Sequence, residues 1–194
     1  INWYQAIAFC NKLSIACNLE PCYEVNGVDF TTLTFDDIPT RTNKKDHTEW
    51  DKVKVSMDKK GFRLPTEAEW EWAGKGGSAD TWAEICENDK REEYEWYDKN
   101  SDKKTHQVKL KKPNDYGLYD TNGNVAEWCW DWYEHYKTPA GGQDPIGVST
   151  GSERTVRGNN WQSPISTAED YSMRSCTEPV FGFCTVGLRV VMRP

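Results

Sequence analysis

The chain has 194 residues, 13% of them aromatic, and a formal net charge of -7 at pH 7. This length predicts one domain, residues 1–194, with a single well-filled core rather than two domains. The acidic balance argues against the basic face that nucleic-acid-binding proteins need, so no nucleic-acid partner is expected. No apolar stretch is long enough to span a bilayer.

The first predicted element is a helix over residues 3–13. Asn2 and Gln5 have the spacing of an N-cap residue and its capping-box partner, and apolar residues then recur at helical spacing as far as Leu13. Because Ile1 stands directly before this helix, we expect that further residues precede it in the natural protein. Contact with a membrane is expected only through a lipid anchor in such an upstream segment.

A β-hairpin is predicted over residues 22–30, where two short extended runs flank Asn26 and Gly27, a dipeptide that favours a tight reversal of the chain. The polar region that follows, residues 31–60, has weak alternation around Val55. It is therefore predicted to be a loop with one short strand.

A second helix is predicted within residues 61–77, GFRLPTEAEWEWAGKGG. Thr66 and Glu69 form a second capping box, and Pro65 cannot extend the helix backward. The glycines that begin at Gly74 end the helix.

The stretch from residue 117 to 133, GLYDTNGNVAEWCWDWY, organises the second half of the chain. Asn122 and Gly123 favour a turn with positive φ. Trp128, Trp130 and Trp132 then stand at every second position, which predicts an extended segment with one buried face.

The turn in this stretch contains a candidate metal site. The carboxylates of Asp120 and Glu127, with the backbone carbonyls of Gly123 and Val125 between them, are the hard oxygen ligands that calcium prefers. The spacing is not that of an EF-hand, however. On spacing alone, a packed turn whose acids are solvated or cap backbone amides remains the alternative.

Two further strands are predicted near the C-terminus, over residues 154–161 and 186–191. The segment between them has no regular pattern. The seven cysteines form no CxxC pair and no zinc spacing. Most are therefore predicted to be small core residues, and a bridge between Cys10 and Cys22 is left open.

Four blocks, GFRLPTEAEWEWA, GLYDTNGNVAEW, RTVRGNNW and GLRVV, occur in this order in the chain. In order and spacing they resemble the formylglycine-generating enzyme or sulfatase-modifying factor family, from residue 2 to residue 193. The resemblance implies an α+β, C-type-lectin-like fold with two helices, small antiparallel sheets and a loop-rich body.

The resemblance also implies a cofactor. Members of this kind hold a calcium ion on a side chain before the turn, two backbone carbonyls and a glutamate. Carried over residue by residue, these ligands fall on Asp120, Gly123, Val125 and Glu127. The implied role of the calcium ion is structural, because it would hold the loop-rich body together.

Catalytic members of the family oxidise a substrate cysteine with copper(I) held by two cysteine thiolates, which are soft ligands. The family spacing places these two positions near Ser166 and Tyr171, and no cysteine occurs between residues 137 and 175. Cys176 and Cys184 lie beyond these positions and are expected to be ordinary thiols. We therefore expect no copper and no catalytic residue.

The end of the chain is more similar to a non-catalytic branch on this scaffold, the variable proteins of diversity-generating retroelements. There the usual randomised codon, once mutated from Asn, cannot specify Lys, Gln, Glu, Met or Trp. Residues 163–186 contain no Lys, Gln or Trp, although Glu169, Met173 and Glu178 would have to be fixed positions. A merely polar, divergent loop is the alternative.

We therefore predict a non-catalytic protein that displays a diversified binding surface on residues 162–186. The alternatives are a copper-dependent oxidase of the formylglycine-generating kind, or a related oxidase that uses a different metal, and, with less support, a carbohydrate lectin. The expected partner is a protein or other macromolecule, and family analogy places the protein at the cell surface or elsewhere outside the cytoplasm.

The predicted contact positions lie on loops that a stable frame would hold, which is where binding residues concentrate. Phe181 and Phe183 would mark a contact site if they are exposed, and the alternative is that they fold inward. The full set is Ser163, Ile165, Thr167, Tyr171, Ser175, Cys176, Thr177, Val180, Phe181, Phe183, Cys184 and Thr185.

Overall fold

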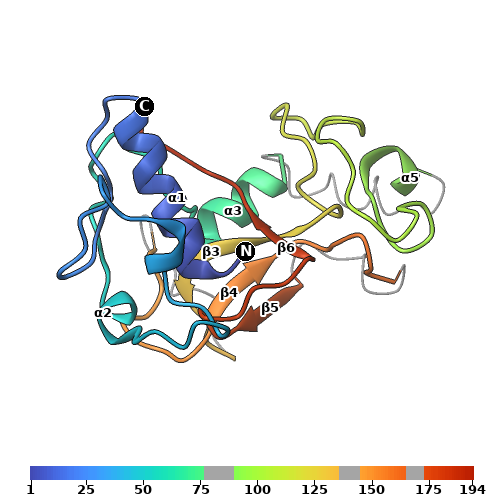
Figure 1. The fold of residues 1–194 in the computed structure, drawn as a ribbon. Helices are drawn as coiled ribbons and strands as arrows, with labels where there is room; N and C mark the ends of the chain where they lie inside the picture. Colours follow the sequence, from blue (N-terminus) through green and yellow to red (C-terminus); the bar gives the residue numbers. More distant parts are fainter. Residues whose placement is uncertain (77–89, 136–144, 165–172) are drawn as a thin grey trace.

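A four-stranded sheet lies at the centre of the molecule, with strand order β5-β4-β3-β6. The computed structural model describes residues 1–76, 90–135, 145–164 and 173–194. The strands are β3 (Ala126–Trp132), β4 (Arg154–Arg157), β5 (Arg174–Thr177) and β6 (Val186–Leu188). β4 pairs antiparallel with both of its neighbours, whereas β6 runs parallel to β3 (Figure 1).

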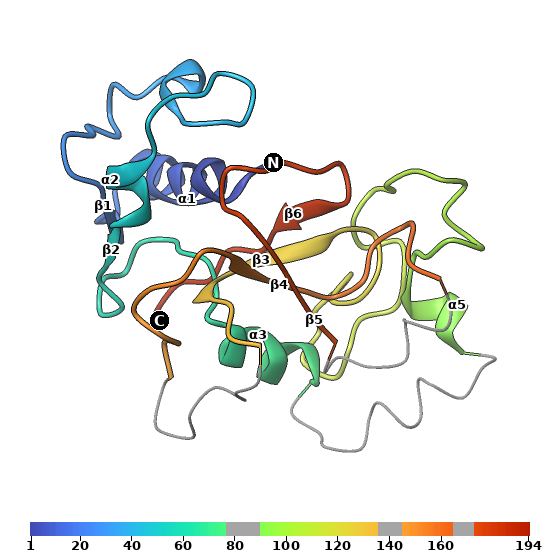
Figure 2. The ribbon, with the colours of Figure 1, turned by 90° about the horizontal axis from the view of Figure 1, so that it is seen from below.

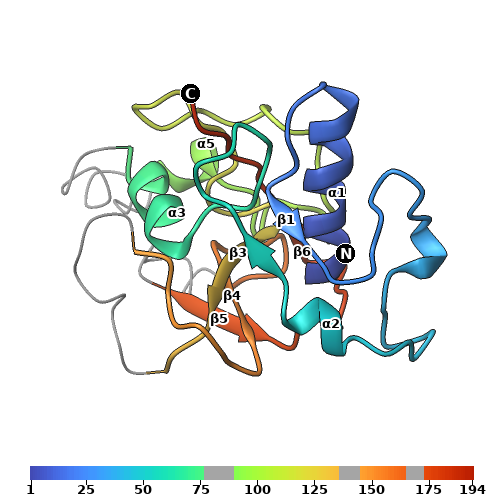
Figure 3. The same ribbon diagram turned by 90° about the vertical axis from the view of Figure 1, so that its left-hand side faces the viewer.

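Helix α1 (Trp3–Ala16) lies on one face of this sheet and helix α3 (Glu67–Gly74) on the other (Figures 2 and 3). The remaining described elements are short. They are β1 (Tyr23–Glu24), η1 (Phe35–Asp37), α2 (Thr48–Asp51), β2 (Lys54–Val55) and α5 (Arg91–Tyr94). The predicted α+β class is therefore confirmed. Within the described ranges, no helix is long and apolar enough to cross a membrane.

The first predicted helix is confirmed, and its start is set by the capping box. The Asn2 side chain accepts a hydrogen bond from the Gln5 amide at 2.8 Å, and the Gln5 side chain accepts one from the Asn2 amide at 2.9 Å. These bonds satisfy two backbone donors that a helix start would otherwise leave unpaired. The helix continues three residues past the predicted end, to Ala16.

The predicted hairpin at residues 22–30 is wrong. The chain does turn at Asn26 and Gly27, where Gly27 has a φ of +75°. However, β1 pairs with the distant strand β2, with Tyr23 opposite Val55. A turn signal fixes where the chain reverses but not which strand it pairs with. The short strand predicted near Val55 is confirmed.

The second predicted helix is confirmed as α3. The hydroxyl of Thr66 accepts the Glu69 amide at 3.2 Å, and the Glu69 carboxylate accepts the Thr66 amide at 2.8 Å. Glu69 also takes two hydrogen bonds from the Arg63 guanidinium, both at 2.6 Å. The capping box is thereby tied to the chain that precedes the helix.

β3 is buried on both faces, which differs from the single buried face that its tryptophans predicted. Trp128 and Trp132 pack on the α1 side and are 0% and 8% exposed. On the α3 side, Glu127, Cys129 and Asp131 are also buried. The strand is central in the sheet and lies between two helices, so six of its seven residues are buried and Trp130 is half-buried.

Four of the described elements were not predicted, η1, α2, α5 and β5. None has more than four residues, too few to show a period. β5 forms because β4 supplies its hydrogen-bonding partner, with Thr155 opposite Cys176 and Arg157 opposite Arg174. The strand therefore depends on tertiary pairing rather than on its own sequence pattern.

The described cysteines are free thiols, so no bridge joins Cys10 to Cys22. Cys22 instead donates from its thiol to the carbonyl oxygen of Gly61 at 3.2 Å. Burial raises the pKa of the Cys10 thiol to about 12. Cys10 and Cys22 thus behave as small core residues. The prediction that most cysteines do so holds for only half of the six described ones, because Cys17 and Cys184 are exposed and Cys176 is half-buried.

The buried amide of Asn11 is expected to contribute strongly to stability. It donates to the carbonyl of Tyr23 at 2.8 Å and accepts from the amide of Tyr23 at 3.0 Å, which joins α1 to β1. Asn11→Ala would leave both backbone groups of Tyr23 unpaired and should cost about 3 kcal/mol. Urea unfolding measures this, with the exposed neighbour Lys12→Ala as control. Equal midpoints for the two variants would contradict the prediction.

Candidate functional site

The turn that begins at Asp120 is held by unusual backbone conformations. Asp120 has a φ of +52°, Gly123 of +78° and Asn124 of +60°. A Cβ atom at Gly123 would lie 2.5 Å from the carbonyl oxygen of Trp96, so only glycine fits. The predicted turn at Asn122 and Gly123 is therefore present and closely packed.

The asparagines of this turn fix three separate loops. The side chain of Asn124 accepts from the amide of His106 at 3.0 Å and donates to its carbonyl at 3.1 Å. The side chain of Asn122 accepts from the amide of Asn159 at 3.0 Å and donates to the carboxylate of Glu95. The turn thus holds loops from distant parts of the chain in place.

Asp120 and Glu127, two of the predicted calcium ligands, lie in different environments. The Glu127 carboxylate is 5% exposed and accepts from the indole of Trp70 at 2.7 Å and from Arg189 at 2.8 and 3.0 Å. One carboxylate oxygen of Asp120 accepts the amide of Lys109 at 2.8 Å. Within the described residues, its other oxygen, Oδ1, is buried without a hydrogen-bond partner.

The electrostatics of this turn suit a cation. Burial raises the pKa of Glu127, the Arg189 guanidinium opposes the shift, and the Asp120 charge adds to it. The Glu127 carboxylate is paired with Arg189, whereas the Arg189 guanidinium meets Asp120 only at its backbone carbonyl. Among the described residues, the unpaired Oδ1 atom of Asp120 is the feature of this turn that a calcium ion would satisfy.

β5 carries the predicted contact positions Ser175, Cys176 and Thr177 at the edge of the sheet. The strand is anchored by Arg174, which donates to the Glu67 carboxylate at 2.5 and 2.7 Å. Glu67 is itself 2% exposed. The start of this strand is therefore fixed by a buried ion pair.

The other predicted contact positions fall into several environments. Ser175 and Cys184 are exposed, and Thr177, Val180 and Thr185 are half-buried. Ser163 is only 9% exposed, and its hydroxyl accepts the amide of Asn160 at 3.0 Å, so in this structure it shapes a turn. Three predicted positions lie outside the described residues, namely Ile165, Thr167 and Tyr171.

The loop between β5 and β6 presents an aromatic pair to solvent. Phe181 and Phe183 have near-parallel rings 6.3 Å apart, and the guanidinium of Arg41 lies 4.9 Å from the Phe181 ring centre. Phe183 is 44% exposed and Phe181 is half-buried. Phe183 therefore faces solvent, and the alternative that it folds inward is wrong.

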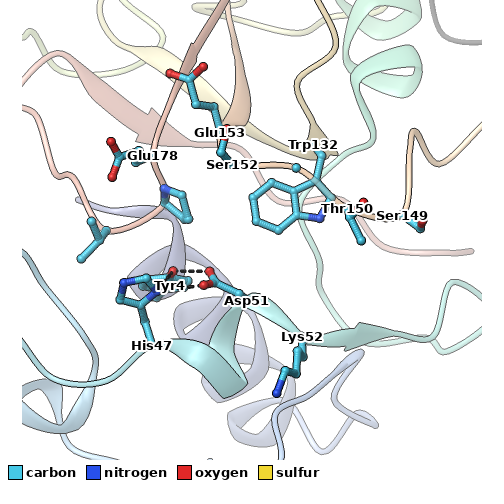
Figure 4. A pocket seen from close by; sticks show the side chains of 13 residues that line it. Tyr4, His47, Asp51, Lys52, Trp132, Ser149, Thr150, Ser152, Glu153 and Glu178 are labelled. Carbon is cyan, nitrogen blue, oxygen red and sulfur yellow. Dashed lines mark hydrogen bonds and ion pairs between the residues drawn. The ribbon is translucent and has the colours of Figure 1, made fainter.

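An open cavity of about 530 Å³ lies beside this loop, and the sequence did not predict it (Figure 4). At its floor, the Tyr4 hydroxyl donates to the Asp51 carboxylate at 2.5 Å, and the Nδ1 atom of His47 lies 2.9 Å from that carboxylate. The His47 and Asp51 pair has i,i+4 spacing and was detectable in the sequence. Its contact with Tyr4 was not, because 43 residues separate Tyr4 from His47.

The arrangement of two helices about a small mixed sheet, with a loop-rich body held at the 117–133 turn, defines a C-type-lectin-like domain of the α+β class. The model of the sulfatase-modifying factor enzyme 1-like domain family matches residues 1–194. The chain therefore belongs to this family, as its sequence blocks indicated.

Among solved structures, Treponema denticola variable protein 1 is 49% identical, with a TM-score of 0.90 over 100% of this chain and 70% of that chain. Curated relatives include the chaperone protein LppX of Paenibacillus barcinonensis, 33% identical over 87% of this chain and 60% of the relative. The formylglycine-generating enzyme of Streptomyces coelicolor is 32% identical over 74% of this chain and 50% of the relative. The chain thus spans about half to 60% of these two curated relatives.

The pH dependence of stability should report on Asp131, which lies in β3 and contacts the start of α3. Its carboxylate accepts the Glu67 amide at 2.6 Å, and burial raises its pKa from 3.8 to about 6. The folded state then binds more protons than the unfolded state, so this contribution is full below pH 4 and is lost as the pH rises through 6.

Two pKa units correspond to about 3 kcal/mol. The free energy of unfolding of the wild-type protein, relative to Asp131→Asn, should therefore fall by about this amount between pH 4 and pH 7. Urea unfolding across this range measures the difference. Parallel pH profiles for the two proteins would contradict the assignment.

Proposed function

We propose that this chain is a non-catalytic binding domain that displays a diversified ligand surface on residues 162–186, as a variable protein of a diversity-generating retroelement. The observation that carries the proposal is the likeness of the whole chain to Treponema denticola variable protein 1, at 49% identity and a TM-score of 0.90. We further propose that the ligand is a protein or other macromolecule and that the domain lies at the cell surface.

The state of the thiols supports a binding role over copper chemistry. A copper(I) site of the family kind needs two thiolates. Cys176 lies on β5, where burial and a hydrogen bond to Glu153 raise the pKa of its thiol to about 11. Cys184 lies in the loop before β6 rather than on β5. An oxidase is the competing function, because some relatives are formylglycine-generating enzymes.

The arrangement of the segment also supports display. Arg174 fixes its second half to α3, and the carbonyl oxygen of Pro179 accepts the Trp3 amide at 3.0 Å. A Cβ atom at Gly187 would lie 2.9 Å from Val125, so the end of the segment is closely packed. Between these fixed points Ser175 and Phe183 are exposed. A rigid frame that carries exposed loops is the usual design of a binding surface.

The neighbouring DNA gives the sharpest test of this function. We expect a second, nearly identical copy of the stretch that encodes residues 162–186, with mismatches confined to adenines of the template copy. Sequencing the flanking region measures this. In parallel, the copper(I)-loaded protein is incubated with oxygen and a cysteine peptide, and unchanged peptide mass is expected. Conversion of the cysteine would establish the oxidase instead.

We also propose that a structural calcium ion binds at Asp120, Glu127 and the carbonyls of Gly123 and Val125. When bound, it would supply positive charge to the carboxylate oxygen of Asp120 that lacks a donor. It would also offset the Asp120 charge that raises the pKa of Glu127.

Calcium should therefore stabilise the chain, by about 2.7 kcal/mol at a concentration one hundred times the Kd. Asp120→Asn should weaken calcium binding at least tenfold, as measured by titration calorimetry. Asp115→Asn removes the same charge from an exposed position of the preceding loop and serves as the control. Equal affinities for the two variants would rule out Asp120 as a ligand.

A further inference from the structure

The cavity beside the 178–185 loop has a floor from the N-terminal third of the chain and a rim from its last third. Tyr4, His47 and Asp51 form the floor, whereas Glu178 and residues 149–153 form the rim (Figure 4). Its volume of about 530 Å³ lies within the range of small-ligand sites. Elements far apart in sequence thus build one concave site.

The floor offers hydrogen-bond acceptors. Nδ1 of His47 lies 2.9 Å from a carboxylate oxygen of Asp51. The carboxylate can only accept, so the proton of this hydrogen bond resides on Nδ1. In this tautomer of a neutral imidazole, Nε2 is an acceptor. The Tyr4 hydroxyl gives its own proton to Asp51, at 2.5 Å. The floor therefore has no strong donor to offer an anion.

The rim adds negative charge. The carboxylate of Glu178 is exposed and has no hydrogen-bond or ion-pair partner among the described residues, and Glu153 lies across the cavity from the floor (Figure 4). Lys52 also lines the cavity, but its ammonium group is held by Glu49 at 2.9 Å. The buried Arg154 behind the floor interacts with Asp51 and offsets that charge. The charge of Glu178 remains, because the Glu153 carboxylate accepts a hydrogen bond from Cys176 on β5.

One wall of the cavity is apolar, from Trp132, Pro179 and Val180. Trp132 is only 8% exposed, so it offers too little ring face to stack a sugar. An apolar wall below a carboxylate rim fits a ligand with an aliphatic stem and a cationic head.

We propose that this cavity binds an alkyl cation, a guanidinium or ammonium group on an aliphatic stem. The stem lies against Val180, and the head contacts Glu178 and the Nε2 atom of His47. This cavity shares Glu178 and Val180 with the 162–186 segment. In that respect alone, its binding of an alkyl cation rests on the proposed function. The floor residues are part of the frame.

The site is tested by NMR on the full chain with N-acetyl-arginine amide as probe. The chain has three histidines, His47, His106 and His135. The imidazole signals of His47 should shift on titration, whereas those of the other two should not. An uncharged probe of the same shape, N-acetyl-citrulline amide, should bind at least tenfold more weakly. Equal binding of the two probes would overturn the proposal.

Glu178→Gln should raise the Kd of the arginine probe at least fivefold. Asp115→Asn changes the net charge equally at an exposed position outside the cavity lining and should leave the Kd unchanged. An equal effect of both variants would show that net charge alone attracts the probe, which contradicts a built site. Unchanged chemical shifts of His106 and His135 in the unliganded variants establish that each is folded.

The cation could belong to a partner polypeptide or to a free amine, and a second pair of probes distinguishes these two sources. A capped Gly-Arg-Gly peptide should bind more tightly than agmatine if a partner polypeptide presents the group, and more weakly if the ligand is a free amine. Failure of all these probes, with a second copy of the 162–186 coding stretch in the DNA, would remove this inference and leave the proposed function standing.

Discussion

Burial of β3 on both faces is the constraint on which the rest of the structure depends. A carboxylate in such a position is very costly unless it is paired. Glu127 is met by Trp70 and Arg189, and Asp131 by the backbone amide of Glu67. These partners come from α3 and from the chain after β6. Satisfying the polar groups of one strand therefore fixes elements from both halves of the molecule.

The same requirement explains how the edge strand β5 stays in place. Glu67 lies beneath β4 and β5, where Arg157 and Arg174 both contact its carboxylate, at 3.4 and 2.5 Å. Arg157 also reaches Glu71 at 2.7 Å. These ion pairs join the side chains of Arg157 and Arg174 to those of Glu67 and Glu71. The side chains of β5 that face solvent take no part in them. Substitutions at exposed neighbours such as Ser175 therefore leave the frame intact.

Features encoded by neighbouring residues were predictable from sequence, and features that need distant partners were not. The capping boxes that begin at Asn2 and Thr66 each depend on a partner three residues away, and both are present. The turn after Val25 is also local, but its strand pairs with residues 54–55, which no short-range pattern specifies. β5 and the cavity floor at Tyr4 depend on contacts across the fold. For the same reason the sequence indicated candidate ligands but not their mutual arrangement.

The buried Arg154 links this frame to the chemistry of the cavity. Its guanidinium lies 3.7 Å from the ring centre of Trp3 and 3.4 Å from that of Trp132, and burial lowers its pKa to about 9. A buried cation of this kind is stabilised by aromatic faces and by nearby negative charge. Asp51 supplies such charge from the cavity floor, so its presence there follows from core stability. The Glu178 carboxylate makes no hydrogen bond or ion pair with the described part of the chain. Its charge at the rim is therefore available to a ligand in the cavity.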